Sequence, residues 1–302
     1  MPAHLEWPEL PYPEWRDTRH TLHRYLQVIG KLRLALAPPE PQWGNVALYV
    51  TARGLHTSPI PHPRGVFDVE VDLIDHVVSI RTAAGGVERI PLGPRSVADF
   101  YAEVMKRLEH LGVPTEITLR PAEVPDPIPF PEDVEHQAYD RDGAHRFWLA
   151  LLATDSVMKE HRGRFLGKVS PVQFWWGSFD LAYTRYSGRL LDPPANENVI
   201  LRHTHDAEQS CVGLWPGDDR SPEALFFAYT YPAPPGIEDA ELTPSEARWN
   251  PAMGEFVLPY DALRTSDDPR RTLLDFMEAA YRAGAERAGW PVELAPPADQ
   301  KR

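Results

Sequence analysis

Apolar residues recur along the chain with two different periods, and each period predicts one kind of element. Between residues 22 and 36 they return every three or four positions, which is typical of a helix with one buried face. Between residues 66 and 73 they alternate with Asp and Glu, which is typical of a strand with one face in the core. Two further short strands follow at 77–81 and 87–92, each after a tight turn. The pattern predicts a helix followed by an antiparallel meander.

The end of this first half carries a capping signal. Ser96 is followed three positions later by Asp99, and apolar residues then return at helical spacing up to Leu111. A helix from Ser96 to Gly112 is therefore expected, with one more strand over residues 115–119.

The second half repeats the same order of elements. We expect a long helix over 144–161, strands at 172–186, 199–205, 211–215, 225–231 and 255–258, and a final helix that Asp268 caps and that ends near Gly289. The fold class predicted is α+β, with two similar halves, each helix, antiparallel meander, helix. Because the order repeats, a structural duplication is a further hypothesis.

Proline marks the boundary between the halves. The chain has 33 prolines among 302 residues, and the densest cluster lies between residues 121 and 131. Neither a helix nor a central strand tolerates that spacing. We therefore expect an N-terminal half over 1–120, a stiff proline-rich connector over 121–143, and a C-terminal half over 144–302.

Charge and composition narrow the classes of function. Lys and Arg number 31 against 44 Asp and Glu, a net charge of −13, which disfavours a nucleic-acid partner. No apolar run is long enough to span a membrane, and the first residues lack the pattern of a secretory signal. The single cysteine, Cys211, lies in an apolar stretch and is expected to be a buried, inert thiol rather than a nucleophile. A cytoplasmic protein is expected.

Five stretches carry a resemblance to a known family. They cover residues 30–36, 48–55, 95–101, 125–130 and, above all, the aromatic run of residues 174–188. Through them the chain resembles a bacterial family classified as a domain of unknown function, number 5996. The resemblance implies no activity and no catalytic residues, because none is established for the family. This chain has Gln173 where the family has His, and His203 where the family often has an aromatic residue.

The aromatic run provides the candidate site. Read as one strand, residues 174–186 place Phe174, Trp176, Ser178, Asp180, Thr184 and Tyr186 on one face. A mixture of large aromatic and polar side chains is typical of a ligand pocket. The alternative is that a helix covers this face and that Asp180 pairs with a basic residue, namely Arg185, Arg146 or Lys168, since an unpaired buried carboxylate is costly.

A second candidate is the pair His203 and His205. On a strand these two side chains would share a face and could share a metal ion, with Asp206 beside them. No further ligand motif completes a zinc site, so no bound metal and no cofactor are predicted. Phosphate-loop, dinucleotide, serine-hydrolase and zinc-protease motifs are absent from the sequence.

These observations lead to one main hypothesis and two alternatives. The main one is a protein that binds a small molecule through Trp176, Ser178 and Arg185, with Asp180 or His205 as the general base if it is an enzyme. The first alternative is a non-enzymatic protein-binding or chaperone-like module that uses its sheet face. The weaker alternative is metal-dependent chemistry at the two histidines. The sequence predicts neither the substrate nor the oligomeric state.

Overall fold

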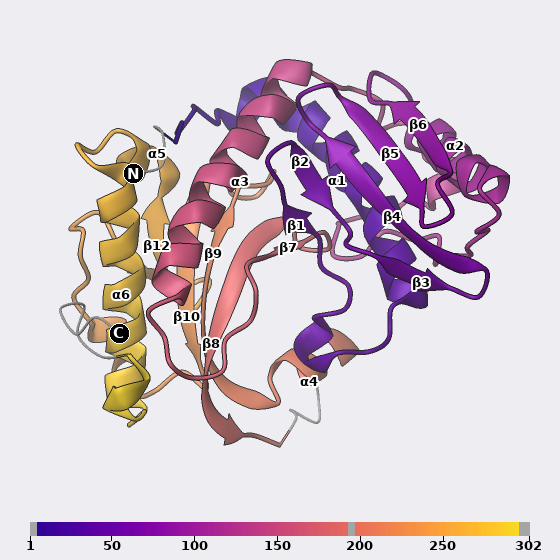
Figure 1. Ribbon diagram of the computed structural model, residues 1–302. Helices are drawn as coiled ribbons and strands as arrows, with labels where there is room; N and C mark the ends of the chain where they lie inside the picture. The colour runs from indigo at the N-terminus through magenta and orange to yellow at the C-terminus, as the bar shows by residue number, and fades with distance from the viewer. Residues whose placement is uncertain (1–4, 193–196, 296–302) are drawn as a thin grey trace.

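The computed structural model describes residues 5–192 and 197–295 (Figure 1). This part of the chain forms six α-helices and two antiparallel sheets of six strands each, which confirms the α+β class. The helices are α1 (Tyr12–Leu36), α2 (Val97–His110), α3 (Arg141–Arg162), α4 (Val199–Thr204), α5 (Tyr260–Arg264) and α6 (Pro269–Arg287).

The first sheet is the predicted meander, extended by short strands. It consists of β1 (Tyr49–Val50), β2 (Gly54–His56), β3 (Ile60–His62), β4 (Gly65–Asp72), β5 (Val77–Thr82) and β6 (Val87–Pro91), in the order β1-β2-β4-β5-β6 with β3 paired to β4. In β4, Phe67, Val69 and Val71 are buried while Asp68 and Glu70 are half-buried, as the alternation predicts. At the start of α2, the Ser96 side chain accepts a hydrogen bond from the Asp99 backbone, which confirms the predicted cap.

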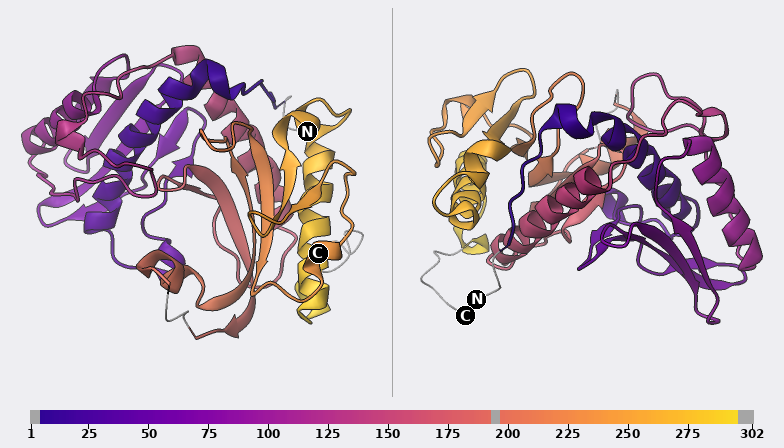
Figure 2. Two further views of the ribbon diagram at one scale, coloured as in Figure 1. Left: turned by 180° about the vertical axis from the view of Figure 1, so that it is seen from behind. Right: turned by 90° about the horizontal axis from the view of Figure 1, so that it is seen from above.

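The second sheet contains the strands of the C-terminal half. They are β7 (Gln173–Trp175), β8 (Asp180–Leu190), β9 (Ala207–Trp215), β10 (Leu225–Tyr231), β11 (Arg248–Asn250) and β12 (Glu255–Pro259), in the order β11-β12-β10-β9-β8-β7. Helices α3 and α6 pack against each other and against one face of this sheet. Figure 2 shows α3 crossing the middle of the molecule between α6 and the first sheet. The candidate functional site lies on the other face of the second sheet.

Three predicted strands are wrong. Residues 173–190 form a hairpin, β7 and β8, around a turn at 176–179, instead of one long strand. Residues 199–204 form helix α4, because the Asn198 side chain caps it by accepting a hydrogen bond from Leu201 N at 3.0 Å. Residues 115–119 are irregular. In the first two cases β-branched or aromatic residues favoured a strand, and turn or cap geometry overrode that preference.

The two halves are joined by direct contacts. Leu48 and Phe174 form an isolated antiparallel bridge, with Leu48 N donating to Phe174 O at 2.9 Å and Phe174 N to Leu48 O at 2.8 Å. Helix α1 contacts α3, and one hydrophobic core includes residues of both halves. Between α2 and α3 the chain has only a short 3-10 turn, Phe130–Glu132. The division into halves at 121–143, and their duplication, stay predictions.

Candidate functional site

A cavity of about 1140 Å³ lies on the face of the second sheet opposite α3 and α6. The strand register explains which side chains reach it. Thr184 of β8 pairs with Cys211 of β9, and Cys211 pairs with Tyr229 of β10, so that these three side chains lie side by side on the cavity face. Residues from 40–46, the loop at 168–171, helix α4 and the segments around 122–123, 218–221 and 252–253 supply further parts of the wall.

Aromatic side chains make up much of the lining. They are Trp43, Trp175, Trp176, Tyr186, Trp215, Phe227 and Tyr229. Gly213 makes room for one of them: a Cβ atom at this position would lie 2.2 Å from Cζ of Phe227. The glycine therefore lets the Phe227 ring lie flat over β9, and the sheet presents an apolar floor of the kind that ligand cavities use.

The turn of the β7–β8 hairpin is fastened to helix α1. Phe179 has a φ of 64°, and its N–H donates to Trp175 O at 2.7 Å. Nε2 of His23 lies 3.0 Å from Trp176 O and 2.9 Å from Gly177 O. Because both of these neighbours are carbonyl oxygens, which only accept hydrogen bonds, Nε2 must carry the proton. Burial lowers the pKa of His23 to about 3, so that the ring is neutral and serves as a fixed donor to the turn.

Asp180 is the first residue after this turn and lies buried at the edge of the cavity, with 7% of its surface exposed. The Ser178 hydroxyl donates a hydrogen bond to its Oδ1 atom. Burial raises the pKa of the Asp180 carboxyl to about 7, and the negative charge of Glu123 adds to the rise, although the bond from Ser178 acts in the opposite direction. A buried carboxyl at this pKa is half protonated near neutral pH.

The basic partner expected for Asp180 is wrong: within residues 5–192 and 197–295, no Lys, Arg or His forms an ion pair with it. Arg146 lies 3.6 Å from Glu14 instead. Lys168 lies over the Tyr186 ring, with Nζ 5.0 Å from the ring centroid. The expectation failed because β8 runs without a bulge from Asp180 to Arg185, and this odd spacing places the two side chains on opposite faces of the strand.

Arg185 is buried against α3 and α6 and does not line the cavity. Its guanidinium donates to His161 O at 2.7 Å and lies 4.5 Å from the Tyr281 ring centroid. Glu278, whose Oε2 atom is 3.8 Å from Arg185 Nη1, also contacts the His161 ring at 3.1 Å. Arg185 is therefore part of the packing between the sheet and its helices, and it does not belong to the cavity lining.

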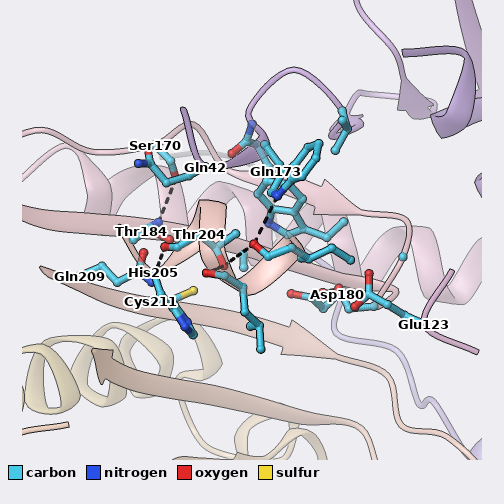
Figure 3. Close-up of a pocket in the computed structure, with 18 of the residues that line it drawn as sticks. Gln42, Glu123, Ser170, Gln173, Asp180, Thr184, Thr204, His205, Gln209 and Cys211 are labelled. Atoms are coloured by element: carbon cyan, nitrogen blue, oxygen red, sulfur yellow. Dashed lines mark hydrogen bonds between the residues drawn. The ribbon is translucent and has the colours of Figure 1, made fainter. Parts of the chain in front are cut away.

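Two further carboxyl groups line the cavity, and neither was a predicted site residue. Burial raises the pKa of Glu255 to about 7, and the charge of Asp180 contributes to this rise. Glu123 is exposed and lies next to Asp180 (Figure 3). A Cβ at Gly177 would lie 2.1 Å from Oε1 of Glu123, so the glycine admits this carboxylate beside the turn. The sequence did contain a signal for Glu255, because a Glu stands at the start of a strand that is otherwise apolar. Glu123 lies in the proline-rich connector, and no sequence pattern marked it as a site residue.

The main chain beside Glu123 is fixed by α1. The Gln27 side chain donates from Nε2 to Ala122 O and accepts from Ala122 N at Oε1, both at 2.7 Å. Gln27 lies one helical turn after His23, so the same face of α1 holds both the hairpin turn and the connector. A polar face of α1 thus positions Asp180 and Glu123, and Glu255 lines the same cavity from β12.

The other predicted site residues line the cavity at different places. The Trp176 indole donates from Nε1 to Val46 O at 2.8 Å, and Ser178 bonds to Asp180. His205 lies at the end of α4, and its ring stacks on Tyr231 with centroids 3.9 Å apart. Figure 3 shows His205 and Asp180 at opposite ends of the labelled group. The structure therefore brings together Trp176, Ser178 and Asp180 but leaves His205 apart from them.

The histidine pair does not form the arrangement that a shared metal ion needs. His203 lies on α4 with its ring against Trp43, at a centroid distance of 5.4 Å, and His205 stacks on Tyr231 instead. The strand on which the metal hypothesis depended is a helix. Among the residues that the structure describes, no group of three or more His, Cys, Asp or Glu side chains is placed to hold a metal ion.

The comparisons with known proteins extend over almost the whole chain. A family model described as a family of unknown function, DUF5996, matches residues 7–296. The chain belongs to this family. No curated protein and no solved structure matches it. In the described part of this DUF5996 protein, no helix combines the length and apolar character that crossing a membrane requires.

In this member of the family, the ionisable groups that line the cavity beside the aromatic rings are mainly carboxyl groups. Burial raises the pKa of the Cys211 thiol to about 12, so the thiolate is scarce at neutral pH even though the residue lines the cavity. Asp180 and Glu255 can instead accept or donate a proton near pH 7, and as carboxylates they can bind a cation.

Proposed function

We propose that this DUF5996 protein binds a small organic molecule in the cavity on the inner face of the second sheet. The observation that carries the proposal is Asp180, a buried carboxyl with no basic partner among the described residues, at the edge of an aromatic cavity of about 1140 Å³. A buried carboxylate without a counter-charge is unfavourable by several kcal/mol. Buried ionisable groups of this kind are typical of functional sites, where a bound ligand can supply the missing partner.

The geometry favours a small molecule over a protein partner. The polar groups converge inside a concave aromatic site, as in ligand cavities. The most exposed large apolar residues are Leu190 at 84%, Val134 at 66%, Val199 at 59% and Val87 at 52% exposed. They come from a strand of each sheet, from helix α4 and from the segment before α3, whereas a protein-binding or chaperone-like sheet face would present them on one sheet.

Proton transfer to or from the bound molecule is a second candidate function. It rests on the two carboxyl groups whose pKa values are raised to about 7, Asp180 and Glu255, since general acids and bases work best near the ambient pH. Binding is the part of the proposal that the cavity supports directly, and it is tested first.

The test uses the tryptophans of the cavity as reporters. We expect members of a chemically diverse compound library to change the tryptophan fluorescence and to raise the melting temperature. Ala182, a buried small residue of the lining, provides the blocking variant: Ala182→Phe places a ring on the cavity floor and should weaken the fluorescence response to the binders. Ala84→Phe, in an exposed turn of the first sheet, is the matched control and should bind as the native protein does. A library without a single binder, or binders unaffected by Ala182→Phe, would overturn the proposal.

A further inference from the structure

The neutral polar groups that line the cavity are largely engaged by the protein itself. Gln173 donates to Gly44 O at 3.2 Å, Gln209 to Thr204 O at 3.0 Å, and Gln42 to Asp206 at 2.7 Å. Ser170 donates to Pro171 O at 2.8 Å and accepts from Thr184 N at 2.9 Å. These groups shape the wall, and their principal hydrogen-bonding needs are met without a ligand.

The carboxyl groups differ from these neutral groups. Asp180 uses Oδ1 to accept from Ser178, and within the described residues Oδ2 has no hydrogen-bond partner. Across the same residues, the side chains of Glu255 and Glu123 take part in no hydrogen bond and no ion pair. Carboxylate oxygens only accept. The cavity therefore offers carboxylate acceptors that no donor of the described residues engages, and Asp180 is the most deeply buried of them.

None of the basic side chains of the lining pairs with these carboxyl groups in the described residues. Lys31 donates to Thr118 Oγ1 at 2.6 Å and lies with Nζ 5.8 Å from the Trp176 ring centroid, and Arg220 pairs with Asp218 at 3.0 Å. Lys168 lies over Tyr186, which is six residues along β8 from Asp180. Six strand residues span roughly 20 Å. The charge that acts on Asp180 is the negative one of Glu123.

Tryptophans flank Asp180 on both neighbouring strands. Trp175 of β7 pairs directly with Asp180. On the other side, Leu181 pairs with Leu214 of β9, which places Trp215 one step along, opposite Asp180. Both tryptophans line the cavity. The face of an indole ring attracts a cation, by about 0.5–2 kcal/mol depending on how well water is excluded.

From this arrangement we infer that the ligand is an organic cation, an amine or ammonium group on an apolar body, whose charged group binds between the Asp180 carboxylate and the indoles of Trp175 and Trp215. The inference rests on the binding function proposed above and adds the class of ligand. The cation supplies the donor and the positive charge that Asp180, Glu255 and Glu123 lack, and the aromatic floor around Phe227 accommodates the apolar body. An anionic ligand would be repelled by the same carboxylates.

The test compares three probes of similar size that differ in charge: benzylamine, benzyl alcohol and benzoate. Each is titrated into the protein at pH 8, where Asp180 is mostly ionised, and binding is followed by tryptophan fluorescence and calorimetry. We expect benzylamine to bind at least tenfold more tightly than benzyl alcohol, and benzoate to bind least. Asp180→Asn should weaken benzylamine at least tenfold and leave benzyl alcohol within twofold. Asp267→Asn, at an exposed loop position, is the control and should change neither.

The outcomes separate this inference from the function on which it rests. Benzyl alcohol or benzoate binding as tightly as benzylamine would overturn the cation assignment and leave the cavity as a binding site. If none of the three probes binds, the cation assignment is tested with the charges of the compounds that bind from the library. Cationic binders weakened tenfold by Asp180→Asn support the inference, and neutral or anionic binders that Asp180→Asn does not weaken overturn it. A library without any binder overturns the function and the ligand class together.

Discussion

Replacing Asp180 by Asn should make the protein more stable at alkaline pH, which is unusual for a buried polar residue. In the folded protein the pKa of this carboxyl is raised from 3.8 to about 7, with burial as the main cause. Between these two pH values the folded chain keeps a proton that the unfolded chain releases. The free energy of unfolding therefore falls as the pH rises from about 4 to 7.

The magnitude follows from the shift. Each pKa unit corresponds to about 1.4 kcal/mol, so a rise of roughly three units costs about 4 kcal/mol once Asp180 is fully ionised. Asn has nearly the same shape, can still accept from Ser178, and carries no charge. The expected gain for Asp180→Asn is thus near zero at pH 4 and up to about 4 kcal/mol at pH 8. Loss of the charge also relieves Glu255, whose pKa it helps to raise, and this relief adds to the gain.

Urea denaturation at intervals between pH 4 and 8 measures the effect, with the free energy of unfolding of the native protein subtracted from that of each variant. The difference for Asp180→Asn should grow with pH and level off above pH 7, whereas the exposed control Asp267→Asn should give a flat line. A flat or falling difference for Asp180→Asn would refute the reasoning. It would mean that Asp180 has a counter-charge after all, since removing one partner of a buried pair is destabilising by about 3–5 kcal/mol.

Two further predictions concern the packing around the site. A Cβ at Gly30 of α1 would lie 2.2 Å from Cδ1 of Trp176, so Gly30→Ala should lower the free energy of unfolding by about 1–3 kcal/mol despite the better helix propensity of Ala. Gly93→Ala, which meets nothing within 4 Å, is the control for chemical denaturation, and equal effects would contradict the close approach. The Cys211 thiol, with its pKa raised from 9.0 to about 12, should react with Ellman's reagent at pH 8 more than 100-fold more slowly in the folded protein than in urea. Similar rates would show that the thiol is not in the environment described.

The parts of the fold that could be predicted are those that local rules determine. The alternation in β4 identifies the core face of the first sheet, and Ser96 and Asp268 each cap the helix that the pattern predicts. The 199–204 segment could not be assigned from its β-branched residues. Its conformation follows from the Asn198 cap, a one-residue signal that the apolar pattern outweighed.

The segment chosen from the sequence does line a cavity, but the reasoning that led to it was partly wrong. Asp180 does line an aromatic cavity, but Phe174 does not share its face, because a four-residue turn separates β7 from β8. The Gly177-Ser178 dipeptide in that turn was an available signal that the aromatic alternation outweighed, and Phe179 adopts a positive φ that a bulky residue rarely takes. What holds the turn is His23, more than 150 residues earlier in the sequence. A contact of this separation has no trace in local periodicity.

The contacts of α1 bear on how the two halves depend on each other. His23 fixes the carbonyls of the turn that precedes Asp180, and Gln27 fixes the main chain beside Glu123. Gly30, on the next turn of the helix, makes room for the Trp176 ring. The acidic end of the cavity is thus built on the second sheet but positioned by a helix of the first half. Because the turn residues make these bonds to α1, the geometry at Asp180 requires both halves to be folded and in contact. The acidic end of the cavity therefore depends on contacts between segments far apart in the chain, helix α1 and the turn before β8.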